Sequence, residues 1–287
     1  MQSPTAVGEG RADPGDDTPP GPATSAPLRR SQLRAVALPS EHGGWGLTLE
    51  PVLLGLIVAH SVAALALGLA TVLAFLARTP LKLAAVDARR GRSLERTRLA
   101  RRVAALELAA LAVLVAVAFA TATPGFWWPI LGIAPLMAVE LSYDVRSRSR
   151  RLVPELAGAI GIAGMAAMMA LAGGRSAALA LALWAILAAR AIAAIPTIRD
   201  QVMRLHGRPS SPTLPWVGDA TALLVAVVAA VAEPLVTAGA VAVGAAILVQ
   251  RALIAWAPTD RAVVLGIRQT VMGLAVVVAT ALGVLLG

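Results

Sequence analysis

The chain alternates long apolar segments with short polar ones. From residue 41 onward, stretches rich in Ala, Leu, Val, Ile and Gly recur near the ~20-residue length that a helix needs to cross ~30 Å of hydrocarbon. This pattern predicts an all-α, multi-pass membrane bundle of nine helices. Their expected ranges are 41–59, 61–80, 102–121, 126–144, 153–172, 176–196, 216–232, 235–256 and 262–286.

Residues 1–38 differ in kind from the rest of the chain. They are rich in Pro and Gly, as at Pro19, Pro20 and Pro22, and they hold few large apolar side chains. Such a segment buries too little apolar area to offset the entropy cost of ordering it. We therefore expect a disordered cytoplasmic tail over 1–38 and a transmembrane helical domain over 39–287.

Positively charged residues occupy only every second gap between the apolar segments, and Arg175 is the exception. Basic loops favour the cytoplasmic side of a membrane, so the N-terminus is expected inside and, with nine helices, the C-terminus outside. The expected location is a bacterial cytoplasmic (inner) membrane. Pro196 is expected to end the sixth helix. The basic groups are Arg29 to Arg34, Arg78 to Arg102, Arg146 to Arg151, Arg199 to Arg208 and Arg251 to Arg268.

Composition supports a membrane protein and excludes several other classes. The chain is 58% hydrophobic and 14% charged, whereas soluble domains average about 25% charged residues. The net charge of +9 comes from arginines in short loops beside apolar spans, which indicates lipid partners and argues against nucleic acid. The absence of cysteine excludes disulfides, thiolate metal sites and cysteine nucleophiles.

Several ionisable residues lie within or at the ends of the predicted spans. A charge at membrane depth costs ~2.5–3.5 kcal/mol on insertion scales and tends to mark a pathway or a site. Glu140 and Asp144 are four residues apart and share one helical face. Most of the set lies near cytoplasmic ends, where charges that extend to the interface are an equally good interpretation. The set comprises Glu41, His42, Glu50, Glu107, Glu140, Asp144, Glu155 and Arg190.

Three short motifs resemble those of a known family. The first is Glu41-His42-Gly43-Gly44-Trp45-Gly46, the second is Leu76-Ala77-Arg78-Thr79-Pro80-Leu81-Lys82, and the third is Ser142-Tyr143. Together they resemble the YwiC-like family of bacterial membrane proteins, over roughly residues 39–287. That family is largely uncharacterised, so the resemblance implies a membrane bundle and little about chemistry.

The predicted topology also resembles the UbiA-type prenyltransferases, which have nine helices and polar loops after helices two, four and six. Those enzymes hold Mg²⁺ and a prenyl diphosphate between two Asp-rich motifs. Here the first motif would be Thr79-x-x-x-Leu83-x-x-x-Asp87 and the second Asp200-x-x-x-Arg204, so two carboxylates remain of the four expected. The resemblance implies Asp87 and Asp200 as the magnesium ligands, and no catalytic residue is assigned.

The same resemblance implies a diphosphate site on the cytoplasmic side. Arginine can bind phosphate oxygens through two parallel hydrogen bonds without a metal, so it is a plausible replacement for the missing carboxylates. The alternative is that these cations serve only to orient the chain in the membrane. The candidate diphosphate-binding residues are Arg78, Lys82, Tyr143, Arg146, Arg199 and Arg204.

Two functional hypotheses follow from these residues. In the first, the chain binds or transfers a prenyl or other lipid diphosphate at a cytoplasmic cavity, and Asp87 and Asp200 face each other. In the second, the chain is a transporter, or a lipid-handling or accessory membrane protein without catalysis, and the polar residues form a track through the membrane. A dry outer half would count against a transport route.

Overall fold

The computed structural model describes residues 42–91, 94–146, 151–258 and 261–287. This part of the chain is helical throughout, with nine α-helices and one short 3-10 helix, which confirms the predicted all-α class. The predicted tail 1–38 and Glu41 lie outside the described residues. The helices are α2 His42–Val58, α3 Val62–Arg89, α4 Glu95–Thr121, α5 Ile130–Val145, α6 Leu152–Ala172, α7 Ala177–Leu205, α8 Thr213–Ala232, η1 Pro234–Val236, α9 Thr237–Trp256 and α10 Ala262–Leu286.

Length and hydropathy mark these helices as membrane-spanning. Seven of the described helices are long and apolar enough to cross a bilayer. The other two, α2 with 17 residues and α5 with 16, are shorter. At ~1.5 Å per residue, the 28 residues of α3 and the 29 of α7 exceed the thickness of the hydrocarbon layer. These helices therefore extend beyond the hydrocarbon.

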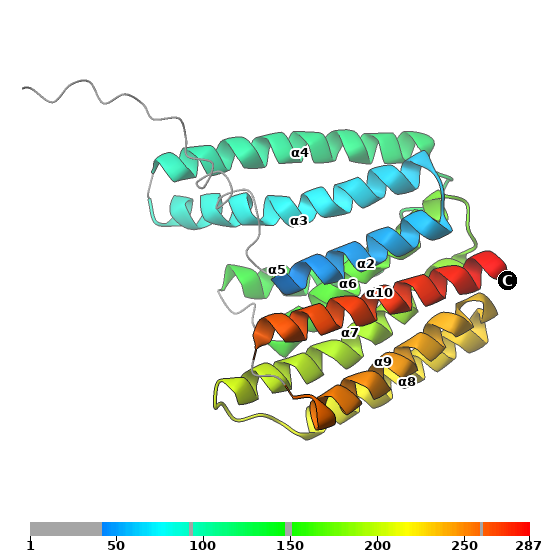
Figure 1. Ribbon diagram of the computed structural model, residues 1–287. Coiled ribbons are helices and arrows are strands. Elements are labelled where there is room, and N and C mark those ends of the chain that lie inside the picture. Colours follow the sequence, from blue (N-terminus) through cyan, green and yellow to red (C-terminus); the bar gives the residue numbers. More distant parts are fainter. Residues whose placement is uncertain (1–41, 92–93, 147–150, 259–260) are drawn as a thin grey trace, which may run out of the picture.

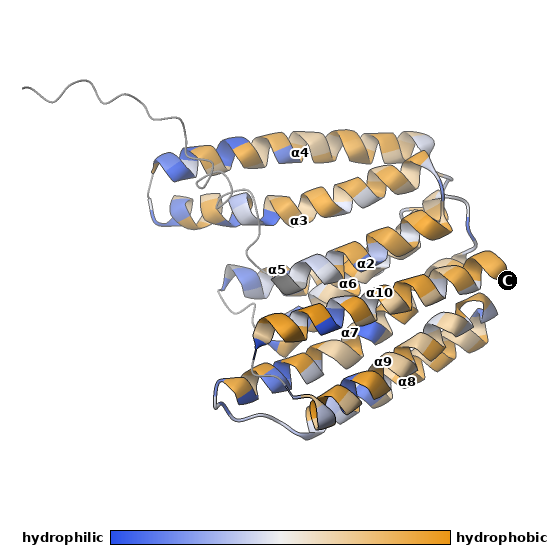
Figure 2. Ribbon diagram, viewed as in Figure 1, coloured by the Kyte–Doolittle hydropathy of each residue, from blue (hydrophilic) through white to orange (hydrophobic). Residues whose placement is uncertain are grey.

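Successive helices run in opposite directions, so the connections alternate between two ends of the bundle (Figure 1). One end holds the start of α2 and the connections α3–α4, α5–α6, α7–α8 and α9–α10, and we call it the basic end. Hydrophilic residues gather there (Figure 2). The opposite end, which we call the short-turn end, holds the α2–α3 and α6–α7 turns and the C-terminus. The helix ends that flank the predicted basic connections thus lie together at one end of the bundle.

The helices pack side by side in a spread-out arrangement with α6 and α7 at its centre. At one edge α4 packs chiefly on α3, and at the other α8 and α9 lie together (Figure 1). Small residues dominate the central contacts, as at Ala166, Ala167 and Ala189, which are all fully buried. Small side chains let helix backbones approach closely where lipid supplies no hydrophobic drive between helices.

Two helices are longer than the hydropathy pattern predicted. The segment 81–101, predicted as a loop, belongs mostly to α3 and α4, because α3 continues to Arg89 and α4 begins at Glu95. Hydropathy detects a helix only where its residues are apolar, so these charged helical turns were predicted as part of a loop. The polar helix ends carry the basic residues beyond the membrane.

The predicted break at Pro196 was also wrong, because α7 continues through it to Leu205. A proline inside a helix leaves the carbonyl four residues earlier without its N–H donor. That carbonyl, Ile192 O, lies against Gly218 of α8, where an added Cβ would come within 2.8 Å of it. The close approach of α8 through Gly218 accommodates the proline inside the helix.

This contact predicts opposite effects for one substitution at two glycines. In Gly218→Ala the new methyl group meets the Ile192 carbonyl and Pro196, so we expect a stability loss of about 1–3 kcal/mol from overpacking. Gly266 of α10 has no atom within 4 Å of an added Cβ, so Gly266→Ala is expected to be neutral or stabilising. Thermal unfolding in detergent tests both variants, and equal losses would contradict the packing described here.

Candidate functional site

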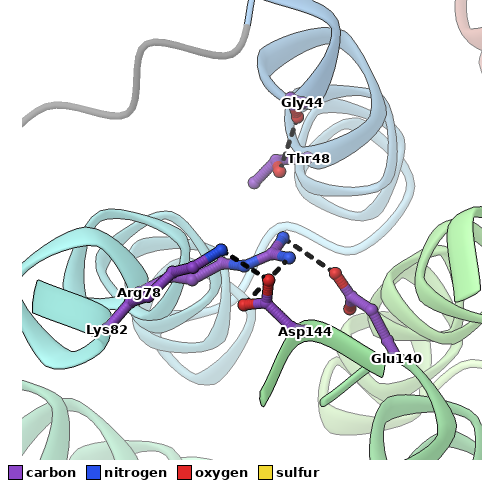
Figure 3. A network of polar contacts seen from close by, with 6 residues as sticks. All are labelled: Gly44, Thr48, Arg78, Lys82, Glu140 and Asp144. Carbon is purple, nitrogen blue, oxygen red and sulfur yellow. Dashed lines mark hydrogen bonds and ion pairs between the residues drawn. The ribbon is translucent and has the colours of Figure 1, made fainter. Parts of the chain in front are cut away.

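Four charged side chains meet between α3 and α5 at the basic end (Figure 3). Arg78 Nη1 lies 2.8 Å from Glu140 Oε1, and Arg78 Nη2 lies 3.5 Å from Asp144 Oδ2. Lys82 Nζ donates a hydrogen bond of 2.6 Å to Asp144 Oδ1. The cation side chains are 36% and 47% exposed, whereas those of Glu140 and Asp144 are only 17% and 8% exposed. We call these four residues the Arg78 cluster.

Helical spacing builds this cluster. Arg78 and Lys82 are four residues apart on α3, and Glu140 and Asp144 are four apart on α5, so each pair shares one face of its helix. The two cations project together because α3 stays helical beyond Pro80. Behind the cluster, Gly158 of α6 makes room for Glu140, since an added Cβ would come within 2.7 Å of that carboxylate.

The first turns of α2 pack beside the cluster. The Trp45 ring meets the edge of Phe75, with 5.1 Å between ring centroids, and Gly44 lies so close to Phe75 that an added Cβ would be 2.9 Å away. The buried Thr48 hydroxyl donates to Gly44 O at 2.8 Å (Figure 3). His42 begins α2, but its side chain lies outside what the structure describes. The start of α2 and the middle of α3, which carry the first two family-like motifs, therefore pack together through Gly44, Trp45 and Phe75.

A second charged pair lies deeper in the bundle. Glu50 of α2 and Arg190 of α7 are each 5% exposed, and Arg190 Nη2 lies 3.6 Å from Glu50 Oε1. Arg190 Nη2 also donates to Gln269 O of α10 at 2.8 Å. Gly273 of α10 leaves space for the Glu50 carboxylate, because an added Cβ there would overlap it. The structure thus brings together two of the polar residues singled out in the sequence.

The remaining candidate cations form contacts of their own. Arg199 lies 3.3 Å from Glu155 Oε2 of α6, and Arg204 pairs with Asp200 of the same helix at 2.9 Å. Tyr143, in the last turn of α5, is half-buried, and the adjoining Arg146 is exposed. None of these contacts joins the Arg78 cluster.

The two proposed magnesium ligands sit in separate surroundings. Asp87 of α3 accepts a hydrogen bond of 2.6 Å from Thr97 of α4 and lies 3.6 Å from Arg96. Asp200 contacts Arg204 within α7. Helix α3 packs on α2, α4 and α6, whereas α7 packs chiefly on α6 and α8. The described residues include no group of three His, Cys, Asp or Glu side chains that would fit a metal ion.

Sequence reasoning missed a third charged pair, between α8 and α9. Arg251 Nε donates to Asp219 Oδ2 at 2.7 Å, and the same guanidinium lies 4.1 Å from the centroid of the Trp216 ring. A lone Asp inside the apolar segment 216–232 was the signal that would have found the pair.

The comparisons assign part of the chain to a family. Residues 38–170 match the family model described as YwiC-like protein. This region is thus similar to the YwiC-like family. It includes α2 to α5, most of α6 and the whole Arg78 cluster, whereas Arg190 lies outside it. No curated protein and no solved structure matches the chain, so the UbiA-like arrangement stays a prediction.

The Arg78 cluster of the YwiC-like region is expected to tie α3 to α5. Asp144→Asn removes the charge that both Arg78 and Lys82 contact, and we expect it to lower the free energy of unfolding by about 1–2 kcal/mol. Asp200→Asn is the matched control, because its partner Arg204 lies on the same helix and such pairs contribute only ~0.2–0.5 kcal/mol. In thermal unfolding, Asp144→Asn should therefore lose more stability than Asp200→Asn.

The buried Glu50–Arg190 pair is expected to be more sensitive to the loss of one charge than the Arg78 cluster is. Glu50→Gln leaves Arg190 buried without its countercharge, so we expect a loss of about 3–5 kcal/mol. The double variant Glu50→Gln/Arg190→Met removes both charges and should recover most of this stability. Unfolding of the single and double variants measures the effect, and a double variant no more stable than Glu50→Gln would contradict the pairing.

Proposed function

We propose that this membrane protein binds the phosphate group of a lipid, such as a prenyl or other lipid diphosphate, at the Arg78 cluster. One observation carries the proposal: Arg78 and Lys82 lie one turn apart, held by two carboxylates, and remain 36% and 47% exposed. The contacts with Glu140 and Asp144 thus hold both cations in place before a ligand arrives. In this proposal the basic end faces the cytoplasm of a bacterial cell.

The chemistry of the two cations suits a phosphate group. The planar guanidinium of Arg78 can donate two parallel hydrogen bonds to phosphate oxygens, and the Lys82 ammonium adds a compact charge. Glu140 and Asp144 restrict both side chains, so less conformational entropy is lost on binding. Exposed arginines on the neighbouring helix ends, among them Arg90, Arg98 and Arg101, attract anions from a longer distance.

Nearby apolar surface favours a lipid over a soluble phosphate. Leu81 beside Lys82 is exposed, as is Leu141 beside Glu140. Both lie at helix ends, where the membrane interface places headgroups and the adjoining hydrocarbon receives the chains. The ligand that fits has an anionic headgroup for Arg78 and Lys82 and an apolar tail that lies along α3 and α5.

The proposal covers binding and no bond chemistry. Asp87 and Asp200, the residues that resemble magnesium ligands, already contact Thr97 and Arg204. The proposed contacts are made by Arg78 and Lys82 themselves and do not require a metal ion. Prenyl transfer accordingly stays outside the proposal.

A transport route finds less support. The buried charged residues lie at the middle of their helices, as Glu50 and Arg190 do, or at the basic end, as Asp144 does. The short-turn half contains apolar side chains such as Leu54 and Val58. The buried hydroxyl of Thr280 there donates within its own helix, to Val276 O. Glu107, another member of the expected polar track, lies apart on α4 at the edge of the bundle. These positions favour a site open to one side.

Native mass spectrometry with added farnesyl diphosphate tests the proposal. We expect Arg78→Gln and Lys82→Gln each to weaken binding roughly tenfold, as loss of a charge-assisted hydrogen bond of about 1.4 kcal/mol would. Arg204→Gln, which removes a cation from the same end, should bind normally. Asp87→Ala and Asp200→Ala should also bind normally.

Two results of these binding measurements would contradict the proposed lipid site. Equal weakening in Arg204→Gln and Arg78→Gln would mean that only the general positive charge attracts the lipid, and it would overturn the site. Unchanged binding in both Arg78→Gln and Lys82→Gln would overturn it too. Free diphosphate, added as a competitor, shows whether the headgroup alone is sufficient for recognition.

A further inference from the structure

Two small neighbouring cavities lie between α7, α9 and α10, next to Arg190 of the buried Glu50–Arg190 pair. Arg190 lines the first, Gln201 and Arg268 line the second, and Gln250, Gln269 and Met272 line both. Each cavity has a volume of about 10 Å³. That is close to the minimum in which one water molecule fits.

Two polar atoms beside these cavities have no hydrogen-bond partner among the described residues. They are Arg190 Nε, a donor, and Gln269 Oε1, an acceptor, and both are buried. A buried polar atom left unpaired costs about 1–3 kcal/mol. Gln269 Nε2 already donates to Gln250 Oε1 at 2.6 Å, so the side chain is fixed with its oxygen available.

Water satisfies both atoms at once, because it donates and accepts. A small anion would satisfy Arg190 but not the Gln269 oxygen, and a metal cation would be repelled by Arg190. The two unpaired polar atoms and the volume together therefore select water as the occupant.

The cavities lead toward only one end of the bundle. Beyond Gln250 the second cavity reaches Gln201 and Arg268, and Arg268 Nη1 donates to Ala257 O at the basic end of α9. In the other direction the neighbours of Arg190 are buried apolar residues such as Ile186 and Val276. The second cavity therefore marks the basic end as the side from which water would reach Arg190.

We propose that a short file of water molecules occupies these cavities and connects the Arg190 guanidinium with the basic face of the membrane. The file hydrates one side of a charge pair that otherwise lies in an apolar interior, and it gives that pair access to solvent from one side only. This site lies on α7, α9 and α10, outside the matched residues 38–170. It is independent of the proposed lipid contact at Arg78.

Hydroxyl-radical labelling by a short X-ray pulse tests the water file, because radicals form from water in place and oxidise adjacent methionine sulfur. Met272 lines both cavities and is 8% exposed, whereas Met168, at 7% exposed, belongs to an apolar cluster. In lipid nanodiscs we expect Met272 to be oxidised several-fold faster than Met168. Equal rates at the two methionines would overturn the proposal.

A variant tests the route itself. Gln269→Leu removes the unpaired oxygen and adds apolar volume where the two cavities join, so oxidation of Met272 should fall to the level of Met168. Undiminished oxidation of Met272 in this variant would overturn the file, because water would then reach Met272 another way. Unchanged oxidation of Met168 confirms that the variant is folded.

Discussion

The structure depends on one constraint: a charge buried among membrane helices needs an opposite charge or water beside it. Glu50, Asp144 and Asp219 each lie within 4 Å of an arginine or lysine on another helix. Such pairs add little stability compared with apolar residues of equal volume. Their presence is therefore better explained by a role at the basic end than by the stability of the bundle.

That constraint divides the bundle into two unlike halves. Toward the short-turn end, small and apolar side chains pack closely, and the buried threonines donate to their own helices, as Thr280 does. From the middle of the helices to the basic end, interhelical ion pairs join α3 to α5, α2 to α7 and α8 to α9. Both proposed sites, the lipid contact and the water file, belong to this part of the bundle because these interhelical ion pairs lie there.

Hydropathy was sufficient to predict the nine α-helices of the described residues and their alternating direction, since both follow from apolar length and loop charge. It failed where helices become polar, as over residues 81–101, and where packing overrides a local rule, as at Pro196 beside Gly218. Spacing alone placed Glu140 and Asp144 on one face. It gave no information on their partners Arg78 and Lys82, because those lie about 60 residues away and depend on how α3 and α5 meet. Gln250 and Gln269 escaped notice because an amide in an apolar span has no motif.

The central claim is that the basic connections all face one side of the membrane. The chain contains no cysteine, so single cysteines report their exposure without background. Cysteines placed at the exposed residues Arg90, Arg146 and His206 of the basic end, and at Pro124 of the short-turn end, should react in opposite vesicle orientations with a membrane-impermeant maleimide. The account predicts that the first three are labelled only in inside-out vesicles and Pro124→Cys only in right-side-out ones. Labelling of Arg90→Cys and His206→Cys from different sides would contradict it.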